Sequence, residues 1–167
     1  MISVVIPTLN DEAVLGRALH PLVAAAVAGL VREVIVADGG SSDATLEIAD
    51  DAGCRILTPP GNDAARAQAA AVTARAEWVM ILDPRAQLLP GWERAVRDHL
   101  ERGPGQAAFM PSLDPDEGSF LGRVRGLFGR GGPAPVVIAT RAVYAAGGPV
   151  GPMRKLAARA VVLQAPG

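Results

Sequence analysis

Short apolar runs alternate with helix-forming segments along the first two thirds of the chain, and this alternation constrains its fold more than any other feature. The apolar runs occupy residues 2–6, 34–37, 55–57 and 78–82. The helix-forming segments occupy residues 11–28, 44–52, 63–75 and 92–102. A run that is apolar throughout is typical of a strand buried on both faces of a parallel sheet. The alternation therefore predicts an α/β fold with a doubly wound, mostly parallel sheet and helices on both of its faces.

The last third of the chain is less regular. We expect short strands at residues 106–110 and 136–139 and a short helix at 140–146. Residues 120–130 carry apolar side chains at helical spacing, with arginines between them. This pattern favours an amphipathic helix that covers one end of the sheet, and a peripheral membrane contact is the alternative.

Charge and cysteine content exclude several classes of protein. The 167 residues include 16 basic and 17 acidic side chains, so no strong field of one sign would attract nucleic acid. The single cysteine, Cys54, cannot form an internal disulfide or a cysteine-based metal cluster. The two histidines, His20 and His99, have no second ligand at metal-binding spacing and are predicted to be structural or surface residues.

The amino end shows no targeting signal, because residues 1–3 lead directly into the first strand pattern. The longest apolar run, residues 21–31, is shorter than the roughly 18 to 20 residues that cross a bilayer. The sequence therefore predicts a cytoplasmic location, and the 120–130 segment leaves membrane association open as an alternative.

Polar and glycine-rich segments follow three of the predicted strands. Residues 7–12 follow the first strand, residues 38–43 the second, and Asp83 the fourth. Because the carboxyl ends of parallel strands meet at one edge of a sheet, these segments form a single ligand-facing rim. Glycine lets a ligand approach the backbone, amides at a helix start suit phosphate, and a carboxylate accepts hydrogen bonds from a base or ribose. Together they predict a nucleotide-sugar site on a Rossmann-like sheet.

The sequence resembles the family 2 glycosyltransferases, which have the GT-A fold. The resemblance lies in residues 4–12, 33–45 and 77–92, with a weaker echo at 141–148. It implies a nucleotide-diphospho-sugar transferase fold. It also implies transfer of a sugar from a nucleoside-diphosphate sugar, of the UDP or GDP type, to an acceptor hydroxyl.

The resemblance implies one domain over residues 1–167, with a nucleotide-binding α/β portion at 1–103 and a smaller acceptor-side portion at 104–167. Asp38 would contact a uracil-type base, and Arg66 would lie near the base or the phosphates. Asp83 would be the first acid of the family's Asp-x-Asp element, near the ribose and the metal. The full predicted nucleotide-binding set is Pro7, Thr8, Asn10, Glu12, Asp38, Gly39, Gly40, Arg66 and Asp83.

Two departures from the family pattern concern catalysis. Arg85 stands where the family places the acid that holds Mg²⁺ or Mn²⁺, and a guanidinium repels a divalent cation. A metal is therefore expected at most weakly, on Asp83. Met153, Arg154 and Lys155 stand where the family usually has an acidic pair that supplies the general base.

Two hypotheses follow from these departures. In the first, Arg85 together with Arg154 and Lys155 offsets the charge of the leaving diphosphate, and the protein is a metal-independent transferase with Asp83 and Arg85 as its catalytic residues. In the second, the domain is a noncatalytic module that binds a nucleotide sugar or a partner. A nucleotidyltransferase fits less well, because the glycine- and arginine-rich phosphate loop of that class is missing after the first strand.

Local structural roles compete with these functional ones. Asp38, Ser42 and Asp43 are also suited to capping the second helix. Arg66 on an alanine-rich helix has the composition of a solvated charge. Asp83 before a proline is also typical of a turn residue without a ligand.

Overall fold

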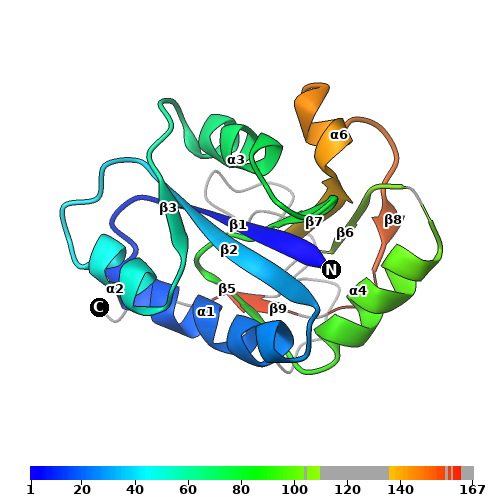
Figure 1. Ribbon diagram of the computed structural model, residues 1–167, viewed down its shortest axis with the longest axis horizontal. Helices are drawn as coiled ribbons and strands as arrows, with labels where there is room; N and C mark the ends of the chain where they lie inside the picture. Colours follow the sequence, from blue (N-terminus) through cyan, green and yellow to red (C-terminus); the bar gives the residue numbers. More distant parts are fainter. Residues whose placement is uncertain (104, 110–135, 157, 159, 163–167) are drawn as a thin grey trace, which may run out of the picture.

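The computed structural model describes residues 1–103, 105–109, 136–156, 158 and 160–162. These residues form a seven-stranded sheet flanked by helices and a separate two-stranded sheet (Figure 1). The strands are β1 (Ile2–Thr8), β2 (Val31–Asp38), β3 (Arg55–Leu57), β4 (Trp78–Ile81), β5 (Ala86–Leu88), β6 (Ala107–Phe109), β7 (Val136–Thr140), β8 (Arg154–Lys155) and β9 (Ala160–Val162). The helices are α1 (Glu12–Val27), α2 (Thr45–Asp51), α3 (Asp63–Val72), α4 (Trp92–Glu101) and α6 (Arg141–Ala145). The predicted α/β fold is confirmed.

The large sheet has the strand order β3-β2-β1-β4-β7-β6-β8. β1 pairs in parallel with both β2 and β4, so that Val5 lies between Ile35 and Ile81. The residues of β1 from Ile2 to Ile6 are fully buried, as their continuous apolar pattern predicts for a strand covered on both faces. Because β1, β2 and β4 run in the same direction, the segments that follow them meet at one edge of the sheet.

The other half of the sheet is mixed. β7 is antiparallel to β4, β6 is antiparallel to β7, and β8 is parallel to β6. The sequence predicted strands at β6 and β7 but did not indicate their direction, and it did not predict β5, β8 or β9. Each of these three has only two or three residues, and β5 pairs with β9 from the end of the chain. No local periodicity marks a strand that short.

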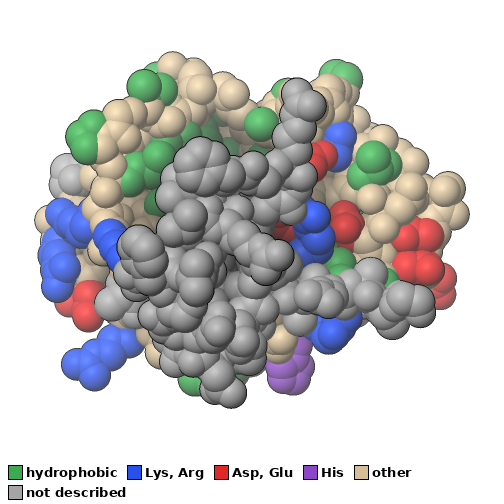
Figure 2. All heavy atoms as spheres, turned by 180° about the vertical axis from the view of Figure 1, so that it is seen from behind, with side chains coloured by type: hydrophobic (Ala, Val, Ile, Leu, Met, Phe, Trp, Pro, Cys, Tyr) green, Lys and Arg blue, Asp and Glu red, His purple; other side chains and the backbone are tan. Residues whose placement is uncertain are grey.

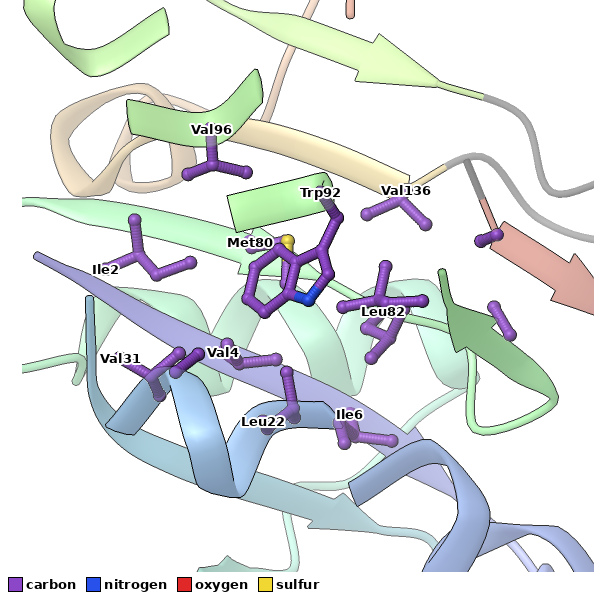
Figure 3. Close-up of a cluster of buried hydrophobic side chains, with 14 of the residues drawn as sticks. Ile2, Val4, Ile6, Leu22, Val31, Met80, Leu82, Trp92, Val96 and Val136 are labelled. Atoms are coloured by element: carbon purple, nitrogen blue, oxygen red, sulfur yellow. The ribbon is translucent and has the colours of Figure 1, made fainter. Parts of the chain in front are cut away.

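Two hydrophobic cores cover the two faces of the sheet. The larger core joins the apolar sides of α1 and α4 to the sheet, and Trp92 of α4 belongs to it, with Met80 and Leu82 drawn beside its ring in Figure 3. The smaller core lies under α3 and α6, the two helices at the top of Figure 1, and includes the alanines of α3 and Tyr144 of α6. Alanine at the buried positions lets α3 approach the sheet closely.

The described helices are all too short or too polar to cross a membrane. Basic and acidic side chains both appear on the face shown in Figure 2, and neither sign covers it. The predicted amphipathic helix at residues 120–130 lies outside the described residues.

Candidate functional site

The loops that follow β1 and β2 are tied to each other by side chains. The Asn10 amide donates to the Ser41 hydroxyl over 2.9 Å, and the Ser42 amide donates to the Asn10 side-chain oxygen over 2.8 Å. Asn10 has a left-handed backbone (φ 56°), a conformation that asparagine tolerates better than most residues. The turn at Asn10 thus sets the distance between the two strand ends.

The start of α1 is tied to the start of α2 in the same way. The Glu12 carboxylate accepts the Ala44 amide over 2.8 Å, and the Glu12 amide donates to Asp43 over 3.2 Å. Asp43 also accepts the Thr45 amide over 3.0 Å. The N-cap of α2 is Ala44, with no side-chain cap hydrogen bond, so the predicted capping by Asp38, Ser42 or Asp43 is wrong. The amides of Glu12, Ala44 and Thr45, at the starts of α1 and α2, therefore already donate to side chains of the protein.

Asp38 is buried and its carboxylate is saturated with hydrogen bonds. One oxygen accepts the hydroxyls of Thr8 (2.9 Å) and Ser41, and the other accepts the amides of Gly40 (2.7 Å) and Ser41 (2.8 Å). Burial alone would raise the pKa of Asp38, but the hydrogen bonds from Ser41, Gly40 and Thr8 outweigh burial, and the pKa lies below its ordinary value. Four donors fill the acceptor capacity of a carboxylate. Asp38 therefore organises the loop, and its contact with a base stays a prediction.

Arg66 is buried, with 5% of its surface exposed, so the alternative of a solvated charge is wrong. Its guanidinium donates to the carbonyl oxygens of Gly61 (2.7 Å) and Thr8 (3.3 Å) and pairs with Asp63 over 2.6 Å. It also lies against Gly39. Arg66 thus joins the ends of β1 and β2 to the start of α3.

Asp83 and Arg85 form a two-point ion pair at the end of β4. The Arg85 Nε and Nη2 atoms donate to the two carboxylate oxygens of Asp83 over 3.0 and 2.9 Å, and the Arg85 amide donates to the same carboxylate over 2.9 Å. Asp83 is 8% exposed, whereas the Arg85 side chain is 49% exposed. The hydrogen bonds to Asp83 raise the pKa of Arg85. Arg85 therefore stays charged, and about half of its side chain is exposed to solvent.

Two further carboxylates lie within electrostatic range of Arg85, and the sequence did not single them out. Asp11 and Asp63 both add to the raised pKa of Arg85. The pKa of Asp11 is raised, mainly because the side chain is half-buried. The carboxylates of Asp83 and Asp63 raise this pKa further, while the Leu9 amide and Arg85 lower it by less. Asp11 precedes the first residue of α1, and Asp63 is the first residue of α3. Acidic residues at the starts of helices that follow the strand ends are the feature by which the sequence could have marked them as site candidates.

Arg154 and Lys155 lie far from Asp83, which corrects the hypothesis that they assist Arg85. They form β8, which is separated from β4 by two strands, or roughly 14 Å at the usual spacing of strands. An Arg154 Nη1 donates to the Nδ1 of His99, a buried residue of α4 that packs edge-on against Trp78. The predicted structural role of His99 is confirmed.

Hydrogen bonds join Thr8, Asn10, Asp38 and Arg66 at the ends of β1 and β2, in part through Ser41, and Asp83 follows β4 at the same edge of the sheet. Their role as nucleotide ligands stays a prediction. Pro7 and the two glycines after Asp38 lie in the same segments, whereas Glu12 serves the contact between α1 and α2. Among the described residues, no group of three His, Cys, Asp or Glu side chains could hold a metal ion.

Comparisons with known proteins agree with the fold. A family model described as Glycosyl transferase family 2 matches residues 3–141. Among solved structures, glucosyl-3-phosphoglycerate synthase from Mycobacterium tuberculosis with Mn²⁺, UDP and glucosyl-3-phosphoglycerate has a TM-score of 0.60 at 23% identity. The same enzyme with phosphoglyceric acid has a TM-score of 0.61 at 21% identity, and with UDP 0.58 at 24% identity. No curated protein matches the chain.

The three alignments cover 86% of this chain and 57% of the synthase chain. The chain therefore spans little more than half the length of these relatives. At this identity the likeness establishes a shared fold, and the predicted GT-A fold is confirmed.

Proposed function

Because the chain belongs to glycosyl transferase family 2, we propose that it binds a nucleoside-diphosphate sugar of the UDP type and transfers the sugar to an acceptor hydroxyl. UDP is favoured over GDP because the similar synthase structures contain UDP. The nucleotide would lie along the rim formed by Pro7, Thr8, Asn10 and the segment that follows Asp38. Residues 104–167 would serve the acceptor, since β6, β7 and β8 extend the sheet on the far side of β4.

The observation that carries the proposal is the ion pair between Asp83 and Arg85. A divalent cation needs oxygen ligands, and both carboxylate oxygens of Asp83 already accept hydrogen bonds from Arg85. A metal does not fit the site as it is folded. The half-exposed side chain of Arg85 carries the positive charge nearest to the end of β4, and it suits a diphosphate because arginine pairs with phosphate at two points.

In the proposed reaction, the oxygen of the acceptor hydroxyl forms a bond to the anomeric carbon of the sugar. The bond between that carbon and the diphosphate oxygen breaks, its electron pair leaves with the nucleoside diphosphate, and the hydroxyl proton is released to solvent. Arg85 would offset the charge that develops on the leaving oxygen, which is the role of a fixed cation in such transfers. Asp83 would hold the guanidinium in place.

A noncatalytic module that binds a nucleotide sugar or a partner is the second candidate. The observation that favours it is the charge around Arg85. Three carboxylates, those of Asp11, Asp63 and Asp83, face the two guanidinium groups of Arg66 and Arg85, and the cluster carries a net charge of −1. A diphosphate must therefore compete with Asp83 for Arg85, and that competition weakens catalysis more than it weakens binding of a neutral ribose or base.

Release of UDP from UDP-glucose separates the two candidates. A transferase without its acceptor still hydrolyses the donor slowly, and Arg85→Gln should lower that rate by about tenfold to a hundredfold, the range for loss of one group that stabilises developing charge. Arg94→Gln, which removes an exposed arginine of α4, is the charge-matched control and should leave the rate unchanged. UDP binding without any release of UDP above background would reject the transferase and support the binding module.

A further inference from the structure

Gly39 lacks a side chain at the point where the Arg66 guanidinium lies. A Cβ atom added to Gly39 would lie 2.6 Å from Cζ, 2.7 Å from Nη1 and 2.9 Å from Nη2 of Arg66. Contacts below 3.0 Å essentially do not occur for a real Cβ atom. The guanidinium therefore fills the space that any side chain at residue 39 would need.

The neighbouring glycine is required for a different reason. Gly40 has a φ of +98°, in the region that L side chains rarely adopt, and nothing lies within 4 Å of its added Cβ. Gly39 has no such positive φ, so its backbone would accept alanine. Two adjacent glycines thus have separate causes, a backbone conformation at Gly40 and a close approach of Arg66 at Gly39.

Arg66 cannot move aside easily to make room. Its guanidinium is held by Gly61, Thr8 and Asp63, three acceptors on two different segments of the rim. Its Nε atom is buried and has no hydrogen-bond partner among the described residues. A shifted guanidinium would leave the Gly61 and Thr8 carbonyl oxygens without this donor.

We propose that Arg66 is a positioning residue and does not itself contact the nucleotide. Residue 39 is then a glycine because the Arg66 guanidinium needs the space, and not because a ligand does. Arg66 joins the ends of β1 and β2 to the start of α3. It also forms an ion pair with Asp63, which lies within electrostatic range of Arg85. With 5% of its surface exposed, Arg66 offers little to a bound molecule. The proposal rests on the proposed function only in its last step, that the rim ordered in this way holds a nucleotide.

A double-mutant cycle on the protein without ligand tests the steric claim. Gly39→Ala alone should lower the melting temperature by about 2 to 12 °C, the range for overpacking in a domain of this size. In an Arg66→Ala background the same substitution should change the melting temperature by less than about 2 °C, because interacting sites are not additive. Arg66→Lys, which keeps the charge but lacks the planar group, gives a second background if Arg66→Ala does not fold. Gly16→Ala on α1, where nothing lies within 4 Å, is the matched control and should not lower the melting temperature.

Equal losses from Gly39→Ala in the wild-type and Arg66-substituted backgrounds would overturn the steric claim, as would an unchanged melting temperature in both. Binding of UDP then tests the positioning role. Gly39→Ala should weaken UDP binding in the wild-type background and much less in the Arg66→Ala background, whereas a direct ligand contact at residue 39 would weaken it equally in both. If UDP does not bind to the wild-type protein, the proposed function fails, and the melting temperatures still decide the role of Arg66.

Discussion

At the scale of single residues, the side chains that the sequence predicts as ligands form hydrogen bonds and ion pairs within the protein. Asp38 accepts four hydrogen bonds from Thr8, Gly40 and Ser41, and Arg85 is paired with Asp83. A carboxylate at a strand end is thus predictable from the sequence, but its partners are not, because they come from turns whose geometry has no sequence period. Most polar side chains of the rim are therefore already paired within the protein.

Substituting Asp38 tests this organising role. Asp38→Asn replaces one acceptor oxygen with an NH₂ group that faces backbone amides, so we expect a loss of about 1–3 kcal/mol in the free energy of unfolding, as for a buried group left unpaired. Urea denaturation at pH 7 measures it. Asp98→Asn, at an exposed position of α4, is the control and should stay within about 0.5 kcal/mol of wild type.

The same residue predicts a pH dependence. Because folding lowers the pKa of Asp38 from 3.8, the unfolded chain takes up the proton first as the pH falls. The contribution of Asp38 is therefore fully present above pH 3.8 and is lost as the pH falls through the lower pKa of the folded state. Asp38→Asn should reduce the steepness of the acid transition, and an unchanged acid transition would contradict the role given to Asp38.

At the scale of elements, the segment that carries Arg85 depends on the end of the chain. β5 begins at Ala86, directly after Arg85, and pairs antiparallel with β9, where Leu88 lies opposite Ala160. Both residues are buried in the larger core. The sequence could not predict this pairing, because both strands have three residues and lie more than seventy positions apart. The position of Arg85 is therefore set partly by β9.

Ala160→Asp tests this dependence. A carboxylate without a partner at this buried position is strongly unfavourable and should detach the short strand β9 from β5. We expect faster hydrogen exchange at the amides of β5 and weaker UDP binding, with exchange in β1 and β4 unchanged. Ala146→Asp, at an exposed position after α6, is the control. Faster exchange across the whole sheet would contradict a local role for β9.

At the scale of the whole molecule, the parallel half of the large sheet was predictable from the sequence, and the mixed half of that sheet was not. The strands β1, β2 and β4 are buried on both faces, so their apolar runs indicate both the type of element and the direction of the sheet. β6, β7 and β8 depend on antiparallel and edge pairings between distant segments, which leave no periodic pattern. The rim lies in the predictable half, so its location could be predicted, whereas the contacts within it required the folded chain.

The central claim at this scale is that the fixed charge of Arg85 serves a nucleotide site without a metal. Calorimetric titration with UDP, with and without Mn²⁺, tests it most directly. We predict measurable binding in both conditions, with dissociation constants that agree within about threefold, a difference well below 1.4 kcal/mol. Binding at least about tenfold tighter with Mn²⁺, or binding of UDP only when Mn²⁺ is present, would contradict the claim.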